Sequence, residues 1–477
     1  MKPPRHTILY FLPLAAFVVV RWGMDFNGLY GQDGHSFYQF SLEIIRSLRG
    51  NADFSQFRVP PIYPLAGAIP GFFAGHPDFF LQLISALSLT GTAWMADRII
   101  RHIHPKSPEN SVATYLSVIL ILSPYMLRGS LMVMTDLMTT FLSTLAVYYI
   151  IQYRQQTAAR QIILLTGAAS LAFLTRYAVA PLLAIPCTLV IGIMIREKKW
   201  THIVLAAGVV LICFVPFLLI KQGNTNEFAN HHLMTSWSVL NAFRRSFSGP
   251  DGTANYQIIN LVTVFYHFFH PAYIFPGIAL VIFVRKVDLQ KESVKFLLAS
   301  IVLYSLFIAG LNFQNKRYLI LSFPLVAICF FPAWQRIKAQ IPTTTFTIAV
   351  IITAFIQLAF SAYLFRSFYK ISQTEKFLVK EISALPPTLL YTFELNMAFK
   401  SYEVPHQVHS LYDRKIDIFP ENSLLLVNEV KWENQWKDQN PVINMNFARS
   451  QYETELLNQF PEGWTLYRIR ERKRRQP

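Results

Sequence analysis

Long uncharged apolar runs constrain this chain more than any other feature of its sequence. Three of them, Phe79–Ala96, Ser111–Leu127 and Ile341–Phe365, contain no charged residue. A helix of roughly twenty apolar residues matches the ~30 Å hydrocarbon core of a bilayer. The apolar residues are continuous and do not recur at the 3.6-residue period of a surface helix. The runs therefore predict an α-helical polytopic membrane protein.

The composition agrees with this prediction and excludes other classes. Hydrophobic residues make up 53% of the 477 residues and charged residues only 15%, whereas soluble domains carry roughly a quarter charged residues. The net charge of this chain is +16, and strongly basic proteins often bind nucleic acid through its phosphates. Here the basic residues lie between the apolar runs, so we assign them to the flanks of spans and expect no nucleic-acid partner. The three cysteines lie in apolar runs and form no CxxC motif, which indicates neither a disulfide framework nor a zinc site.

The apolar runs predict about eleven transmembrane helices. The expected spans begin near residues 7, 79, 111, 134, 161, 177, 201, 261, 296, 318 and 342. The first follows basic residues as a signal peptide does, but it lacks a small-residue cleavage site, so we interpret it as a retained span. The stretch 161–195 permits either a hairpin of two short spans turning at Arg176 or one long tilted helix. The hairpin is preferred because a single crossing would place Arg196–Lys199 on the opposite side from the other basic loops.

Loop charge orients these spans. The short loops on one side are all basic, which makes that side cytoplasmic by the positive-inside rule and places the N-terminus there. An odd number of spans then puts the C-terminus outside. The larger outer segments are residues 24–78, about 221–260, and 366–477. We therefore expect a transmembrane domain over 1–365 and a small soluble domain over 366–477 on the outer (periplasmic or extracellular) side.

Two of the outer segments have a predictable local structure. In the first, Asp33–Leu48 predicts an amphipathic helix, with Phe37, Phe40, Ile44, Ile45 and Leu48 at helical spacing on its apolar face. The proline-rich stretch Pro60–Phe73 is expected to dip into the membrane interface without crossing, the alternative being a short extra span. In the C-terminal segment, β-like runs at Thr388–Phe393, Leu424–Asn428 and Trp464–Ile469 alternate with helical stretches and predict a small α/β domain.

Ionisable side chains are rare in the middles of the spans and gather at their outer ends. They are Asp33, Arg58, Arg128, Asp136, Arg176, Lys316 and Arg317. Arginine binds phosphate bidentately, and a carboxylate serves as a general base, so this mixture fits a phosphate-bearing substrate. Structural interpretations stay open for each: the two acids as helix N-caps, Arg176 as a snorkelling turn residue, and Lys316 and Arg317 as span flanks.

Four motifs resemble the GT-C membrane glycosyltransferases, and most closely the bacterial relatives of protein O-mannosyltransferases and of the lipid A aminoarabinose transferase. The resemblance covers roughly residues 7–335. Its motifs are Gly31–Tyr38 after the first span, Arg58–Leu65 closing the same loop, Met134–Asp136 at the start of the fourth span, and Leu174–Arg176 together with Asn315–Leu319. Each motif alone is weak, and their order and common outer location carry the resemblance.

The resemblance implies a role for each of these residues. Asp33 corresponds to the catalytic acid and Asp136 to a second acid that orients the acceptor or the partners of Asp33. Four basic residues lie where relatives bind the donor phosphate, and three further residues are candidate substrate contacts. The basic residues are Arg58, Arg176, Lys316 and Arg317, and the contacts are His35, Tyr63 and Tyr318. Relatives often carry paired acids in the first loop, whereas here Gln32 precedes a single Asp33. One carboxylate is a poor divalent site, so we assign no cofactor and regard metal dependence as doubtful.

Together these features predict a glycosyltransferase of the bacterial inner (cell) membrane. It would move a sugar from a polyprenyl-phosphate donor to a lipid, lipopolysaccharide, glycan or protein acceptor at the outer face, by an inverting displacement with Asp33 as base. Membrane lipids are its other expected partners. A lipid-linked substrate transporter or flippase is the alternative and needs no catalytic acid. A non-catalytic membrane scaffold that presents the C-terminal domain is the third hypothesis.

Overall fold

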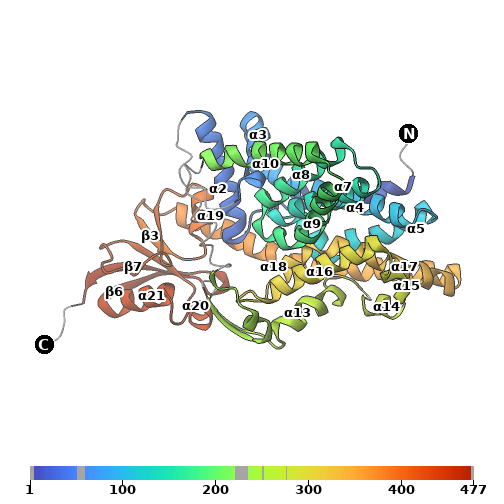
Figure 1. Cartoon of the computed structure of the whole chain (residues 1–477). Helices are drawn as coiled ribbons and strands as arrows, with labels where there is room; N and C mark the ends of the chain where they lie inside the picture. Colours follow the sequence, from blue (N-terminus) through green and yellow to red (C-terminus); the bar gives the residue numbers. More distant parts are fainter. Residues whose placement is uncertain (1–4, 51–59, 221–234, 250–251, 276, 474–477) are drawn as a thin grey trace. The chain divides into compact units, whose positions relative to one another are not determined.

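The computed structural model describes residues 5–50, 60–220, 235–249, 252–275 and 277–473 (Figure 1). The chain folds into two compact units. The first contains Met1–Gly28, Phe40–Arg244 and Ile258–Phe365, and the second contains Leu29–Gln39, Arg245–Gln257 and Arg366–Pro477. Two helices, α2 (Gly31–Leu48) and α18 (Thr343–Ser383), belong partly to each unit.

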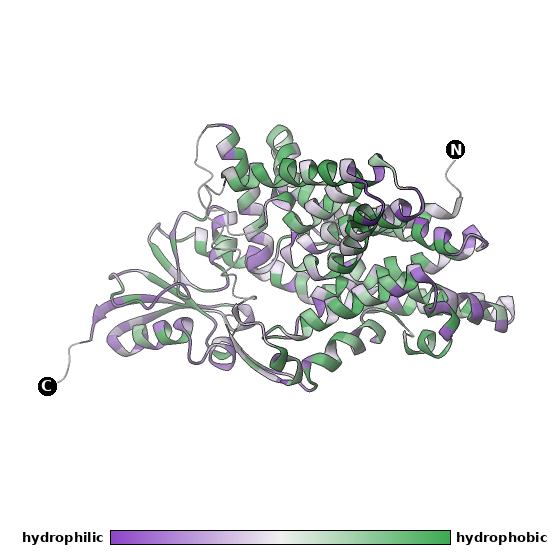
Figure 2. Cartoon of the chain, in the orientation of Figure 1, coloured by the Kyte–Doolittle hydropathy of each residue, from purple (hydrophilic) through white to green (hydrophobic). Residues whose placement is uncertain are grey.

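The first unit is helical, and Figure 2 shows that hydrophobic residues dominate its helices. Its longer helices start close to the predicted span starts. Besides the segments of α2 and α18, the described α-helices of this unit, long and short, are α1 (Leu12–Val18), α3 (Ile62–Ala74), α4 (Pro77–Ile103), α5 (Glu109–Leu116), α6 (Pro124–Ser130), α7 (Thr135–Gln155), α8 (Ala159–Thr175), α9 (Ala180–Arg196), α10 (Trp200–Ile220), α13 (Asn260–Tyr266), α14 (Gly277–Ile282), α15 (Lys286–Leu289), α16 (Glu292–Ala309) and α17 (Phe323–Gln340). Short 3₁₀ or π turns extend several of them, including η1 (Arg5–Phe11), η2 (Val19–Gly23), η3 (Ser117–Ile121), η4 (Tyr177–Val179), η5 (Val239–Phe243), η6 (His267–Phe269) and η7 (Lys316–Leu321).

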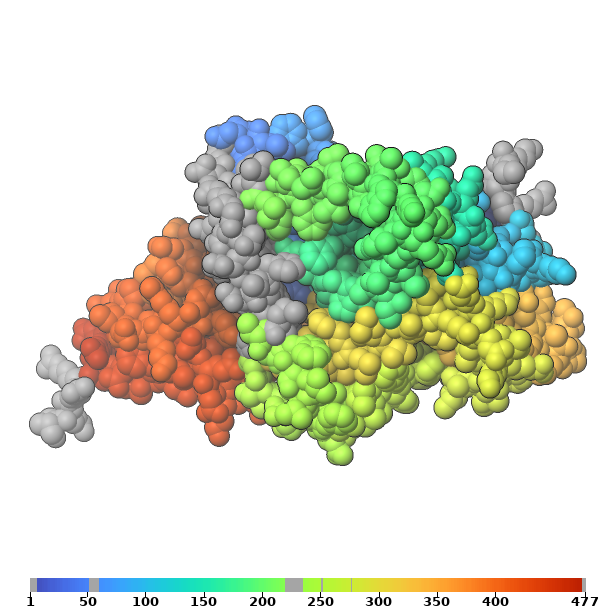
Figure 3. Space-filling view, viewed as in Figure 1, coloured from blue at the N-terminus to red at the C-terminus, as the bar shows by residue number. Residues whose placement is uncertain are grey.

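Length and composition single out the helices of the described residues that can cross a membrane. Five qualify, or six if the bent pair Glu109–Ile121 and Pro124–Ser130 forms one span. The five are Pro77–Ile103, Tyr177–Arg196, Trp200–Leu218, Glu292–Ala309 and Thr343–Ser383. α10 lies on the surface of its unit in Figure 3, and only 6% of its most apolar window is buried, as expected for a lipid-facing helix. The chain is an α-helical multi-pass membrane protein, and the number of about eleven spans stays a prediction.

The stretch 161–195 forms two helices and not one long tilted helix. α8 ends at Thr175 because Arg176 adopts an extended conformation (φ −159°, ψ 114°). One 3₁₀ turn follows, and α9 then begins with Pro181 in its first turn, where a missing N–H costs nothing. The break falls at Arg176, where the hairpin interpretation places it.

The outer loop 24–78 contains the predicted amphipathic helix, α2. Ile44 and Ile45 are buried and pack with Ala68 of α3, and Phe40 and Phe72 lie against them. Leu48, assigned to the same apolar face, is exposed at the end of the helix. α3 is a helix of 13 residues, about 20 Å long, which is too short to span the bilayer core. The proline-rich stretch therefore forms a short helix packed on α4, in agreement with a segment that does not cross.

A close backbone contact joins α3 to α4 and yields a stability prediction. A Cβ atom on Gly71 would lie 2.9 Å from Pro77 Cβ and 3.0 Å from Pro77 Cα. Because backbone atoms cannot step aside as a flexible side chain does, Gly71→Ala is expected to destabilise the protein by about 1–3 kcal/mol. Thermal unfolding in detergent measures this loss. Gly192→Ala in α9 is the matched control, since nothing lies within 4 Å of its added Cβ; an equal loss there would contradict the packing argument.

The second unit is a small α/β domain, whose strands carry both hydrophilic and hydrophobic residues in Figure 2. Its five-stranded sheet has the order β4-β3-β5-β7-β6. β4, β3 and β5 are parallel to one another, and β7 runs antiparallel to both of its neighbours, β5 and β6. Its elements are β3 (Leu389–Thr392), α19 (Asn396–Ser401), β4 (Gln407–Ser410), β5 (Leu424–Val427), α20 (Glu429–Gln435), α21 (Asn440–Gln451), β6 (Tyr452–Gln459), η8 (Pro461–Gly463) and β7 (Thr465–Arg472). A hairpin of β1 (Ser246–Gly249) and β2 (Gly252–Asn255) completes the unit.

The three predicted β-like runs are confirmed as β3, β5 and β7. All four residues of the central strand β5 are buried, as expected for a strand covered on both faces. Sequence reasoning missed β4 and β6, which lie at the two edges of the sheet. Edge strands carry polar residues and lack a continuous apolar signal, so their composition does not separate them from loops.

Candidate functional site

A buried carboxylate at the start of α7 forms the centre of the candidate site. Asp136 lies in the first turn of the helix and is 1% exposed. Met134, in an extended conformation, is the N-cap residue, and it makes no side-chain capping bond. Asp136 is therefore not an N-cap, which removes the structural interpretation that the sequence left open. Its negative charge still faces the positive end of the α7 dipole.

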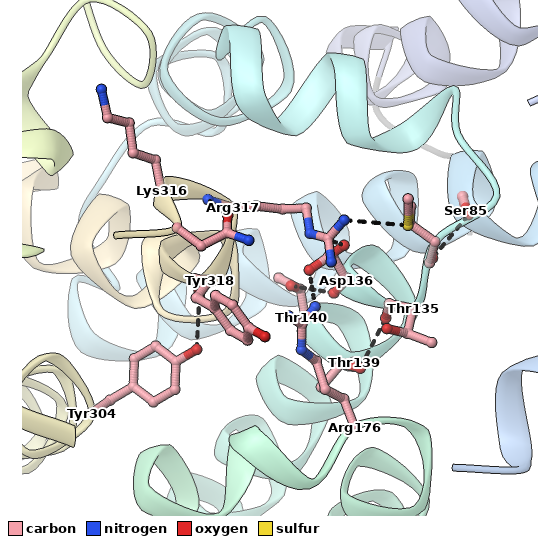
Figure 4. Close-up of polar contacts among 12 residues, drawn as sticks. Ser85, Thr135, Asp136, Thr139, Thr140, Arg176, Tyr304, Lys316, Arg317 and Tyr318 are labelled. Carbon is pink, nitrogen blue, oxygen red and sulfur yellow. Dashed lines mark hydrogen bonds and ion pairs between the residues drawn. The ribbon is translucent and has the colours of Figure 1, made fainter. Parts of the chain in front are cut away.

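Both carboxylate oxygens of Asp136 contact an arginine (Figure 4). Oδ1 pairs with the Nη1 atom of Arg176, and Oδ2 lies 3.3 Å from the Nε atom of Arg317. Arg176 is 9% exposed, so it does not snorkel to the interface, and Arg317 does more than flank a span. A buried charge is tolerated only when it is paired, and one carboxylate here serves two guanidinium groups.

Local structure holds each arginine in place. The chain break at Arg176 points its side chain at Asp136, and its guanidinium lies 4.2 Å from the centroid of the Tyr318 ring, a cation–π geometry. Arg317 is the second residue of the 3₁₀ turn η7, where its backbone N–H donates to the Oδ1 atom of Asn315 at 3.0 Å. The Nη1 atom of Arg317 also lies 3.5 Å from the Met134 sulfur.

Tyr318 is the third member of this cluster. It is 9% exposed, and its backbone carbonyl accepts a 2.7 Å hydrogen bond from the Tyr304 hydroxyl of α16. Tyr304 is a residue that sequence reasoning missed, because a tyrosine inside an apolar span carries no motif signal. Its bond fixes the loop that carries Arg317 and Tyr318. It therefore acts on the site through the backbone.

Lys316 differs from the two arginines. Its side chain is exposed and points away from Asp136 in Figure 4. Partial burial nevertheless lowers the pKa of its ammonium group, because the surrounding protein replaces some of the water that would stabilise the charge. Its backbone carbonyl accepts a 2.6 Å bond from the Tyr273 hydroxyl. Lys316 is thus a cation held beside the cluster with its charge available.

The other predicted residues of the outer loop have different surroundings. Asp33 and His35 belong to the second compact unit, Asp33 being exposed and His35 fully buried. Asp33 is the third residue of α2 and not its N-cap. Tyr63 is fully buried and its hydroxyl donates to the Leu81 carbonyl at 2.9 Å, which accounts for it without a substrate. Arg58 lies outside the described residues.

Metal-ligand geometry is not found in the part of the chain that the structure describes. No group of three or more His, Cys, Asp or Glu side chains there is placed to hold a metal ion. The chemistry that the cluster itself offers is electrostatic. Two arginines share one carboxylate, and both guanidinium groups present donors suited to a phosphate.

The fold is similar to that of a GT-C membrane glycosyltransferase, in agreement with the resemblance predicted from the four motifs. In particular, it is similar to ArnT from Cupriavidus metallidurans. The structure of ArnT bound to undecaprenyl phosphate matches with a TM-score of 0.60 at 13% sequence identity, over 96% of this chain and 97% of that chain. The apo structure matches over the same shares with a TM-score of 0.62 at 12% identity. No protein-family model and no curated protein sequence matches the chain.

Proposed function

We propose that this protein is a membrane glycosyltransferase that takes a sugar from a polyprenyl-phosphate donor and transfers it to an acceptor hydroxyl. The observation that carries the proposal is the cluster of Asp136, Arg176 and Arg317, on a fold shared with a transferase structure that contains undecaprenyl phosphate. One carboxylate holds two buried or half-buried guanidinium groups close together. Guanidinium groups placed in this way suit an anionic phosphate, which each can bind through parallel hydrogen bonds.

The donor phosphate is the ligand that these groups suit best. Arginine forms parallel hydrogen bonds to phosphate, and a cation held in a low-dielectric site acts more strongly than one in water. Arg176, Arg317 and Lys316 would stabilise the charge that develops on the leaving phosphate. Asp136 would act as a positioning residue that aims both guanidinium groups, since each of its oxygens already contacts an arginine. Arg58 keeps its proposed phosphate role on sequence resemblance alone.

The proposed reaction is a single displacement with inversion at the anomeric carbon. The acceptor oxygen forms a bond to this carbon while the bond from the carbon to the phosphate oxygen breaks. The polyprenyl phosphate leaves with the electron pair, and Asp33 takes the proton of the acceptor hydroxyl. The base role of Asp33 rests on its motif and on its exposed carboxylate at the start of α2.

A reconstituted assay tests the function. Full-length protein in proteoliposomes receives radiolabelled undecaprenyl-phosphate-linked hexoses and pentoses, with extracted cell-envelope lipid and glycan as the acceptor pool. We expect label to move to an acceptor and free undecaprenyl phosphate to appear, with Arg176→Gln strongly impaired. Movement of intact donor across the bilayer without cleavage would instead identify a transporter or flippase and would overturn the proposal.

The lowered pKa of Lys316 predicts a pH dependence for phosphate binding. As pH rises through this lowered pKa, the ligand-free protein loses the ammonium charge earlier than an ordinary lysine would, so affinity for undecaprenyl phosphate falls. Lys316→Arg keeps its charge at all accessible pH values and is expected to flatten the fall. Binding measured by intrinsic fluorescence across alkaline pH checks this. Identical pH profiles for the two proteins would show that Lys316 does not contact the phosphate.

A further inference from the structure

A second buried carboxylate has the start of α2 as its partner. Glu375 of α18 is 3% exposed and lies in the second compact unit. Its Oε1 atom accepts a 2.8 Å hydrogen bond from the backbone N–H of Gly31, and its Oε2 atom lies 3.2 Å from the Nε2 atom of His35. A carboxylate only accepts, so the protonated nitrogen of a neutral His35 is Nε2. Both oxygens of Glu375 thus bind the first turn of one helix.

Helix geometry explains how this contact affects Asp33. Residues four apart lie on one face of an α-helix, so Gly31 and His35 both face Glu375. Asp33, two residues from each, lies on the opposite face. Burial follows the same division, since His35 is fully buried and Asp33 exposed. Glu375 therefore contacts the face of α2 that carries His35, and the Asp33 carboxylate lies on the opposite face.

Further contacts attach the same segment to the C-terminal part of the unit. Gln32 donates to the Oδ1 atom of Asn396 at 2.8 Å, and Gln39 donates to the Ser401 hydroxyl at 3.2 Å. The His35 ring packs edge-on against Tyr402 with centroids 5.5 Å apart. Every one of these partners lies in α19 or directly after it. The residues on both sides of Asp33 are therefore fixed to the C-terminal domain.

The partners of Glu375 set it apart from the other buried acids among the described residues. Asp97 and Asp136 each pair with an arginine. Glu375 has a backbone amide and an imidazole, together with the positive end of the α2 dipole. Burying a carboxylate with such partners is a weak source of stability. Gly31 also enters the helix with φ +56°, a left-handed conformation that favours glycine, so its N–H reaches Glu375 at a backbone turn that few residues adopt.

We propose that Glu375 is a positioning residue that holds the first turn of α2, and with it Asp33, so that the C-terminal domain is part of the catalytic apparatus. This inference rests on the proposed transferase function and on Asp33 as its base. Misplacing a catalytic group by about 1 Å costs roughly 100-fold in rate. The loss of Glu375 therefore acts on turnover through the geometry of Asp33.

A hydrogen-exchange experiment tests whether Glu375 holds the first turn of α2, and it requires no activity assay. In full-length protein in detergent, Glu375→Leu is expected to speed amide exchange in a peptide covering residues 29–39 by about tenfold or more. Glu375→Gln keeps an acceptor for the Gly31 N–H and is expected to lie between Glu375→Leu and the wild type. It also serves as the informative variant if Glu375→Leu does not fold. Unchanged exchange in both variants overturns the proposal.

The matched control is Glu429→Gln in the same unit. Glu429 accepts a 2.7 Å hydrogen bond from the Tyr467 hydroxyl and pairs with Arg449, so its replacement removes an acid network of the C-terminal domain. Because these partners lie in α21 and β7, exchange over residues 29–39 is expected to stay at the wild-type rate. Faster exchange in this control as well would show a general loosening of the domain and would overturn a specific role for Glu375.

A double-mutant cycle tests whether Glu375 affects turnover through Asp33. Glu375→Leu is expected to lower kcat by about 10–100-fold with KM within about twofold. The same replacement in an Asp33→Asn background is expected to change kcat by less than about twofold, since the group it positions is already lost. Equal losses in both backgrounds overturn the positioning role. If Asp33→Asn alone keeps full activity, the proposed base is wrong, while the exchange result still decides whether Glu375 holds the turn.

Discussion

Asp136→Leu is expected to destabilise the protein by about 3–5 kcal/mol, the cost of leaving buried partners of a removed charge uncompensated. Arg176 and Arg317 both rely on this carboxylate, and Arg176 is 9% exposed. Without it, two guanidinium groups remain close together and largely shielded from water. Thermal or denaturant unfolding of the full-length protein in detergent measures the loss, and transfer activity should disappear with it.

Two comparisons show whether the loss comes from the buried charges. Glu455→Gln removes an acid that pairs with Arg470 at an exposed site and should cost at most about 1 kcal/mol. Adding Arg176→Gln to Asp136→Leu removes one guanidinium together with its partner and should recover part of the stability lost in Asp136→Leu. If Asp136→Leu unfolds like the wild type, the two arginines do not depend on this carboxylate and the three side chains do not form one electrostatic unit.

Asp33→Asn is expected to lower kcat of sugar transfer by about 10²–10⁴-fold, the usual contribution of a general base. The amide has nearly the same shape as the carboxylate but cannot accept the acceptor proton. Since Asp33 is exposed at the first turn of α2, its replacement should leave thermal stability within about 0.5 kcal/mol. Asp33→Asn is therefore expected to lower the rate of transfer without lowering stability, whereas Asp136→Leu is expected to lower both.

Asp413→Asn provides the control for this rate measurement. Asp413 is an exposed acid in the C-terminal domain, and its replacement should leave kcat unchanged. Wild-type turnover by Asp33→Asn in correctly inserted protein would contradict the base assignment. The fold similarity to a GT-C enzyme does not depend on this result, and another acid would then have to be the base.

Much of the fold could be predicted because the signals are local. An uncharged apolar run predicts a membrane helix from its own residues, and the periodicity of residues 33–48 predicted the amphipathic helix α2. The strands β3, β5 and β7 were predicted in the same way. The break at Arg176 was preferred over one long helix only because of the charge of the other loops. The edge strands β4 and β6 were not predicted, because their polar residues are stabilised by pairing with neighbours that lie elsewhere in the chain.

Of the residues at the candidate site, some could be predicted from the sequence and others could not. Motif likeness selected Asp136, Arg176 and Arg317, with Asp136 orienting the acceptor or the partners of Asp33 and the arginines binding the donor phosphate. The structure joins all three in one ion-pair cluster that the motifs did not predict, and their roles stay predictions. Tyr304 and Glu375 carry no motif and could not be selected, since each acts through a partner distant in sequence.

The amino-acid sequence by itself determined that this chain is a helical membrane protein with charged residues near the ends of its expected spans. Hydropathy and charge are properties of short segments, so no tertiary information is needed to read them. Only the tertiary structure decided which charges meet. Asp136 and Arg176 are separated by 40 residues and Gly31 and Glu375 by 344, and helix packing alone brings each pair into contact. Burial then makes the loss of either partner costly, because a charge removed from water must find its partner within the protein.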